Sequence, residues 1–160
     1  MDKLFYDRIL GIDPGASGGI ACFEYGGGFS VVKMPETERD VWEHLVSLAF
    51  KDEERLGIFA ILEQVHSMPK QGVASSFKFG ANYGMLRAFL IAADIPFETV
   101  TPAKWQRELG CLSHGDKNVT KKRAQELFPI RKITHATADA LLIAEYARRL
   151  HFNYWPKENA

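Results

Sequence analysis

The feature that most constrains this chain is a glycine-rich octapeptide at residues 11–18, Gly-Ile-Asp-Pro-Gly-Ala-Ser-Gly, which lies between two apolar runs. The first run, residues 9–12, ends at Asp13, and the second covers residues 20–23. Two short apolar runs joined by a glycine-rich turn predict a β-hairpin. Asp13 would then stand at the end of the first strand, where a carboxylate can cap the turn, pair with a basic neighbour or bind a metal ion.

The rest of the chain predicts an alternation of strands and helices. Residues 29–34 extend the hairpin by a third strand, and residues 57–62 form an apolar run, typical of a strand covered on both faces, that ends at Glu63. A short fifth strand is predicted over residues 97–100. The spacing of apolar residues predicts helices at residues 38–53, 72–93, 103–109, 117–127 and 135–150.

The last predicted helix carries an acid on its buried side. Asp139 shares a face with four apolar residues, Leu142, Ile143, Tyr146 and Leu150. His135 lies one turn before Asp139 on the same face, whereas Glu145 is expected on the opposite, solvent-exposed side. Asp139 is therefore the third candidate site acid of the chain, after Asp13 and Glu63.

This order of elements is that of the ribonuclease H-like fold, an α/β fold with a five-stranded mixed sheet whose first three strands are antiparallel. In that fold the first and fourth strands are neighbours, so Asp13 and Glu63 would meet at one edge, and the last helix would bring Asp139 and His135 there. Three clustered carboxylates require a cation, and hard oxygen ligands favour Mg²⁺ or Mn²⁺ over Zn²⁺. A pair of such ions hydrolyses phosphodiester bonds without a covalent nucleophile.

In this interpretation Asp13 bridges both metal ions, and Glu63 and Asp139 each bind one of them. His135 either completes the ligand sphere of one ion or orients the attacking water. The four residues are therefore both the candidate metal ligands and the candidate catalytic residues.

The chain resembles the RuvC-like Holliday-junction resolvases over most of its length. The resemblance rests on GIDPG at residues 11–15, LEQV at residues 62–65, the helix with Gly80 and Gly84, PAK at residues 102–104 with Asp116-Lys117, and ADAL at residues 138–141. It implies a homodimeric endonuclease that binds a four-way DNA junction and nicks two strands symmetrically. It further implies two Mg²⁺ or Mn²⁺ ions per active site and no small-molecule cofactor.

By this resemblance, Asp13, Glu63 and Asp139 match three of the family's four catalytic acids. The fourth position is Ala136 in this chain, and His135 is the residue that can take its place.

The resemblance also assigns residues to DNA binding. Lys104 and Lys117 match basic residues that act at the scissile phosphate, and His66 matches the aromatic residue that enters the junction centre. Lys70, in the loop after His66, and Lys121, one turn after Lys117, are the further residues expected to contact DNA.

Charge is distributed unevenly along the chain. The formal net charge is zero, but residues 1–63 hold 6 Lys or Arg against 12 Asp or Glu, a balance of −6, and residues 102–132 hold 8 against 3, a balance of +5. The zero total argues against a generally basic protein that coats nucleic acid. The basic stretch favours local contact with DNA, although two ordinary solvated faces would give the same pattern.

Length and composition predict a single intracellular domain over residues 1–152, with a loosely held tail at residues 153–160, and the resemblance implies that this domain is the nuclease. The two cysteines have no metal-site spacing, and no apolar run is long enough to span a membrane or to lead secretion. Two alternatives remain within this interpretation: a nuclease for other branched DNA or RNA–DNA hybrids, and a junction-binding module without activity. An actin-like phosphotransferase would need a second lobe, which 160 residues do not accommodate.

Overall fold

The fold is built on a five-stranded mixed sheet with the strand order β3-β2-β1-β6-β7. The computed structural model describes residues 6–65, 72–129 and 132–151. The strands of this sheet are β1 (Arg8–Asp13), β2 (Gly19–Glu24), β3 (Phe29–Lys33), β6 (Ile58–Glu63) and β7 (Phe97–Val100). Strands β1, β2 and β3 pair antiparallel, whereas β6 runs parallel to both β1 and β7. The predicted ribonuclease H-like sheet is thereby confirmed.

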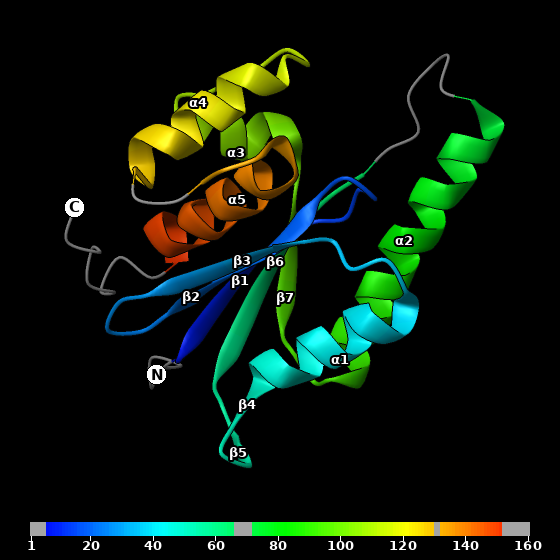
Figure 1. The fold of residues 1–160 in the computed structure, drawn as a ribbon, viewed down its shortest axis with the longest axis vertical. Helices are drawn as coiled ribbons and strands as arrows, with labels where there is room; N and C mark the ends of the chain where they lie inside the picture. The colour runs from blue at the N-terminus through cyan, green and yellow to red at the C-terminus, as the bar shows by residue number, and fades with distance from the viewer. Residues whose placement is uncertain (1–5, 66–71, 130–131, 152–160) are drawn as a thin grey trace.

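Five helices cover the two faces of this sheet. They are α1 (Glu38–Ala49), α2 (Val73–Ala92), α3 (Pro102–Glu108), α4 (Lys117–Leu127) and α5 (His135–His151). Figure 1 shows α3, α4 and α5 on one face of the sheet and α1 and α2 on the other. Each layer encloses its own hydrophobic cluster, so the sheet is buried on both sides. This explains why β1 and β6 are apolar almost throughout.

Helix α5 packs on β1 and β2 at unusually close range. A Cβ atom on Gly11 would overlap the carbonyl oxygen of Ala140 and the amide nitrogen of Ala144. A Cβ atom on Gly19 would lie 2.7 Å from the carbonyl oxygen of Ala136. The three alanines recur every four residues, so one small-residue face of α5 lies directly on the glycines of the sheet. This contact fixes the height of α5 above the end of β1.

The segment after α1 differs from its prediction. The helix ends at Ala49, and a two-stranded hairpin follows, β4 (Phe50–Lys51) and β5 (Glu54–Arg55). Its turn residues have positive φ angles, 49° for Asp52 and 68° for Glu53, which a helix cannot contain. The sequence did not indicate this reversal of the chain direction, because the Asp and Glu residues of the turn also suit the exposed face of a helix.

The predicted exposure of Glu145 is wrong. Its side chain is buried, and its carboxylate accepts hydrogen bonds from Arg148 Nε at 2.7 Å and Arg149 Nε at 2.6 Å. These ion pairs, at i, i+3 and i, i+4 spacing along the helix, compensate the buried charge. Leu150, which was expected on the buried stripe, is 48% exposed because it lies near the end of α5.

Helix α2 buries only part of its apolar surface. Leu86 and Leu90 are buried, but Phe77 is 79% exposed. A Cβ atom on Gly80 or Gly84 would meet nothing within 4 Å. Within the described part of the chain, no helix is long and apolar enough to cross a membrane. The predicted tail at residues 153–160 lies outside the described residues.

Candidate active site

Two carboxylates stand side by side at one end of the sheet. The parallel register of β1 and β6 pairs Ile12 with Leu62, so Asp13 and Glu63 are the next residues on adjacent strands. Asp13 is 8% exposed, and its Oδ1 accepts a hydrogen bond from Gly15 N at 3.1 Å. Both acids therefore occupy the edge that the sequence predicted for them.

Asp139 reaches the same edge from α5. It lies between Ala136 and Ala140, on the part of the helix that contacts the glycines of β2 and β1. Its Oδ1 atom is buried and has no hydrogen-bond partner, and the Thr120 hydroxyl of α4 bonds to its carboxyl group. A buried carboxylate oxygen without a donor is costly, which is typical of a site that a cation completes.

The three acids interact electrostatically. Burial, with a smaller contribution from the Asp139 charge, raises the pKa of Asp13 to about 6. Burial, together with the charges of Asp13 and Asp139, raises the pKa of Glu63 to about 8. Burial also raises the pKa of Asp139, while the Thr120 hydrogen bond, the Lys117 ammonium and the His135 imidazole lower it. The site thus gathers negative charge in an environment that opposes ionisation, and a bound cation would reverse this opposition.

The predicted basic residues differ in their relation to this site. Lys117 is the first residue of α4, and its charge lowers the pKa of all three acids. His135, at the start of α5, acts in the same way on Asp139 alone. Lys104 lies on the exposed side of α3, and Lys121 is half-buried on α4. His66 and Lys70 lie outside the described residues.

The donor set suits Mg²⁺ or Mn²⁺. Carboxylate oxygens are the preferred ligands of both ions, and the unpartnered Oδ1 atom of Asp139 is available as one. Among the described side chains, no group of three acids, histidines or cysteines is already closed around a metal position. Asp13, Glu63 and Asp139 therefore fit the ion in chemical type and location, and ligand closure would accompany binding.

The turn after Asp13 is shaped by its glycines. Gly18 N donates to Gly15 O at 2.8 Å, which closes the turn. A Cβ atom on Gly18 would overlap the Asp13 carbonyl oxygen and lie 2.6 Å from its Cγ, whereas one on Gly15 would keep 3.4 Å from Asp13 Oδ1. A side chain at position 18 would therefore displace the Asp13 carboxylate, and Gly18 avoids this displacement.

Replacement of Gly18 by Ala is expected to reduce metal-dependent activity by about 100-fold, because a carboxylate displaced by roughly 1 Å loses its alignment. Gly15→Ala is the matched control in the same turn and should change activity by less than about threefold, since its Cβ makes ordinary contacts. Initial rates and far-ultraviolet circular dichroism of both variants would be compared. Equal rates for the two variants would contradict this role of Gly18.

The raised pKa values predict that the metal-free protein loses stability as the pH rises. Asp13 and Glu63 bind protons more tightly in the folded protein, with pKa values of about 6 and 8. The protonated forms of these two acids therefore stabilise the fold fully near pH 4, and this contribution to the free energy of unfolding is lost by about pH 8. The lowered pKa of His44 acts oppositely, but on a single group. Urea unfolding in EDTA at pH 5 and pH 8 would measure the loss, and saturating Mn²⁺ should reverse it at pH 8. Constant or rising stability would refute the prediction.

One contact of the site was not foreseen from the sequence. Trp105 Nε1 donates to Glu63 Oε2 at 2.7 Å from the otherwise apolar side of α3. Trp105 directly follows Lys104, so the only available signal was a buried tryptophan beside a candidate site lysine. Indole nitrogens usually find a partner when buried, but the sequence does not say which one.

The comparisons with known proteins are structural. No protein family description matches the chain, and no characterised protein sequence is significantly similar to it. A Thermus thermophilus RuvC structure aligns with a TM-score of 0.57 and 19% identity, over 89% of this chain and 96% of that one. T. thermophilus RuvC in complex with a Holliday junction substrate aligns with a TM-score of 0.61 and 16% identity, over 91% and 97%. The chain therefore has the fold of these RuvC structures.

Proposed function

We propose that this chain is a structure-specific DNA endonuclease that resolves four-way junctions by symmetric paired nicks, with Mg²⁺ or Mn²⁺ as its cofactor. The observation that carries the proposal is the meeting of Asp13, Glu63 and Asp139 at one edge of a RuvC-like fold. The likeness to RuvC in complex with a Holliday junction substrate supports branched DNA as the ligand. Each acid comes from a different element of the fold, as a cleavage site built on rigid elements requires.

In this mechanism Asp13, Glu63 and Asp139 would hold the metal ions. When bound, the ions would lower the pKa of the attacking water and stabilise the leaving oxygen. His135 orients the water or completes a ligand sphere from the first turn of α5. The site accommodates this work because Asp13 is buried and Glu63 and Asp139 are half-buried, so solvent screens their charges less than it does at an exposed surface.

Lys117 contacts the scissile phosphate in the proposed complex. Its ammonium group already acts on all three acids, so a phosphate bound over the acids lies within its reach. The exposed Lys104 and the half-buried Lys121 extend this positive surface along α3 and α4. The basic stretch of the sequence therefore faces the substrate, while acidic residues are concentrated before β6.

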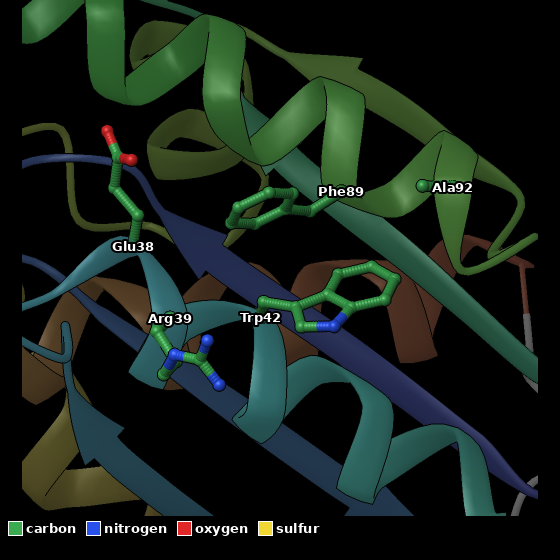
Figure 2. Close-up of a pocket in the computed structure, with 5 residues that line it drawn as sticks. All are labelled: Glu38, Arg39, Trp42, Phe89 and Ala92. Atoms are coloured by element: carbon green, nitrogen blue, oxygen red, sulfur yellow. The ribbon is translucent and has the colours of Figure 1, made fainter.

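The protein acts as a homodimer through α2 in this proposal, because two nicks in a symmetric junction require two active sites. Exposed apolar residues and exposed glycines recur at helical spacing along one face of α2. In the proposed dimer this face contacts a second copy of the chain through Val73, Phe77, Gly80, Gly84 and Ile91. Trp42 of α1 and Phe89 of α2 pack with ring centroids 5.4 Å apart and line an apolar groove between these two helices (Figure 2). Glycines in the middle of the helix would let two such helices cross closely.

Light scattering should give twice the chain mass of 18.0 kDa for the wild type and the single-chain mass for Phe77→Asp. A charge at this 79% exposed position would be buried without a partner in the dimer. Leu150→Asp is the matched control, since Leu150 is exposed on α5 and on the other face of the sheet. A wild-type protein that is monomeric at micromolar concentration would refute the dimer. A Phe77→Asp protein that remains dimeric would show that the dimer interface does not include this face of α2.

The decisive test is cleavage of an end-labelled four-way junction in Mg²⁺, Mn²⁺ and Ca²⁺. We expect nicks at symmetric positions of two opposing strands with Mg²⁺ and Mn²⁺, and binding without cleavage in Ca²⁺, because Ca²⁺ is larger and holds its ligands in looser geometry. Linear duplex of the same sequence and an RNA–DNA hybrid are the control substrates. Equal cleavage of these controls would indicate a general nuclease, and binding without cleavage in all three metals would indicate a junction-binding module.

A further inference from the structure

The hydrogen bond from Trp105 to Glu63 is more than a packing contact. Trp105 is fully buried on α3, 42 residues away from Glu63 in the sequence, and its Nε1 donates to Glu63 Oε2 at 2.7 Å. This distance is at the short end of the range for hydrogen bonds with an ionised acceptor. The indole carries only a donor and no acceptor, so it favours a carboxylate over a second donor at this place.

The surroundings of Glu63 make this donor important. Glu63 is half-buried at the end of β6, beside the end of β1 that carries Asp13. A donor that reaches its carboxylate from the buried side of α3 is compatible with the ionised, metal-binding form. A Glu side chain also has several rotatable bonds, and a bond to one oxygen restricts where the other oxygen lies.

We propose that Trp105 is a positioning residue of the metal site, which occupies Oε2 of Glu63 and leaves Oε1 to bind the ion. The proposal rests on the metal-binding part of the proposed function and extends it to a residue outside the ligand set. Trp105 serves this purpose from a fixed position, because its ring is enclosed by the hydrophobic cluster between the sheet, α3 and α5. Carboxylate ligands held by such an outer hydrogen bond lose less freedom when the metal binds.

Helix α3 carries one residue of the proposed site on its buried side and one on its exposed side. Trp105 is its fully buried side chain and Lys104, the preceding residue, lies on its exposed side. The helix begins at Pro102, whose fixed φ suits a first helical position, so α3 has a defined start close to the end of β7. Strand β7 pairs with β6 through Val100 and Glu63. The donor and its acceptor are therefore attached to neighbouring strands of one rigid sheet.

The test is Trp105→Phe, which keeps most of the ring volume and removes the donor. Calorimetric titration of the DNA-free protein with Mn²⁺ should show about 10-fold to 100-fold weaker binding than the wild type. Trp42→Phe is the matched control, because Trp42 packs against Phe89 between α1 and α2 (Figure 2) and should leave Mn²⁺ binding unchanged. These two helices lie on the other face of the sheet from α3 (Figure 1). A folded Trp105→Phe protein that binds Mn²⁺ like the wild type would overturn the proposal.

A second measurement avoids dependence on the folding of that variant. In wild-type protein labelled with ¹⁵N-tryptophan, Mg²⁺ should shift the Trp105 indole resonance and leave the Trp42 resonance in place. Glu63→Gln, which keeps an acceptor but loses the charge, should shift the same resonance and weaken its response to Mg²⁺. A Trp105 indole resonance whose chemical shift does not change when Mg²⁺ is added would refute the proposal.

The outcomes also separate this proposal from the proposed function. If Mn²⁺ binds tightly and depends on Trp105 but no four-way junction is cleaved, the positioning role holds and the resolvase function fails. If junctions are cleaved, the rate of Trp105→Phe should recover with excess Mn²⁺, because a weakened site can be saturated. A loss of rate that excess Mn²⁺ does not restore would exclude positioning of a metal ligand as the role of Trp105.

Discussion

Asp13→Asn is expected to abolish junction cleavage and, in the same protein, to raise the melting temperature. Asn keeps the size of Asp13 and can still accept the hydrogen bond from Gly15 N, but it lacks the charge that would bind two metal ions. Loss of a bridging ligand removes several kcal/mol of transition-state stabilisation, so we expect at least about a 1,000-fold lower nicking rate. Junction binding in Ca²⁺ should remain detectable, since the basic residues are unchanged.

The gain in stability follows from the cost of burying the charge. The pKa of Asp13 is raised from 3.8 to about 6, which corresponds to about 3 kcal/mol when the group is fully ionised at pH 8. Removal of this charge should raise the melting temperature in EDTA by about 5 °C or more. The sign follows because the raised pKa means that ionisation destabilises the folded state more than the unfolded one.

Glu36→Gln is the control for a general effect of charge, because Glu36 is exposed and should affect neither rate nor stability. Scanning calorimetry and single-turnover cleavage would be measured on the same preparations. Asp13→Asn that cleaves within tenfold of the wild type would exclude Asp13 as a metal ligand. If neither protein cleaves but both bind the junction equally, the chain is a binding module.

The opposite signs of activity and stability are typical of a site assembled for an ion. Asp13, Glu63 and Asp139 all have raised pKa values, with burial as the main cause. A structural ion pair has the opposite pattern, as Glu145 shows. Two arginine side chains lower the pKa of that buried acid. The contrast between these acids within one chain supports metal binding more strongly than proximity alone.

The sequence predicted the sheet and the three acids because both depend on short-range patterns. Apolar runs end where strands leave the core, so Asp13 and Glu63 could be placed at strand ends from their own neighbourhoods. Parallel pairing of β1 with β6 then brought them together, and this step came from the fold rather than from the local sequence. Asp139 followed from the helical spacing of its apolar neighbours.

Contacts that depend on side-chain direction could not be predicted in this way. The Trp105 donor required α3 to sit over the end of β6, which leaves no local pattern in the sequence. The Glu145 ion pairs have the i, i+3 and i, i+4 spacing of helical charge pairs, but this spacing alone does not show that the acid is buried. The roles of His66 and Lys70 stay predictions, since both lie outside the described residues.

Two glycines of the opening octapeptide have close neighbours that the sequence did not indicate. Gly18 abuts Asp13, and Gly11, within β1, abuts the backbone of α5. The octapeptide therefore positions both an acid of the sheet and the helix that carries Asp139.

Gly11→Ala is expected to be the most destabilising single-methyl change in this region. Its Cβ would overlap two backbone atoms of α5, the carbonyl oxygen of Ala140 and the amide nitrogen of Ala144, and neither can rotate away as a side chain can. Overpacking of this kind costs about 3 kcal/mol, so the melting temperature should fall by roughly 10 °C. Gly15→Ala, in the same octapeptide, should change it by less than about 2 °C.

The same change tests how the active site is built. If α5 must move away from β1 to admit the methyl group, Asp139 moves with it while Asp13 and Glu63 stay on the sheet. Mn²⁺ binding by Gly11→Ala should then weaken below its melting transition, where the protein is still folded. A stable Gly11→Ala protein with wild-type Mn²⁺ affinity would mean that α5 does not set the position of Asp139. Lower stability with unchanged affinity would limit the role of Gly11 to packing, because a metal site tolerates misplaced ligands poorly.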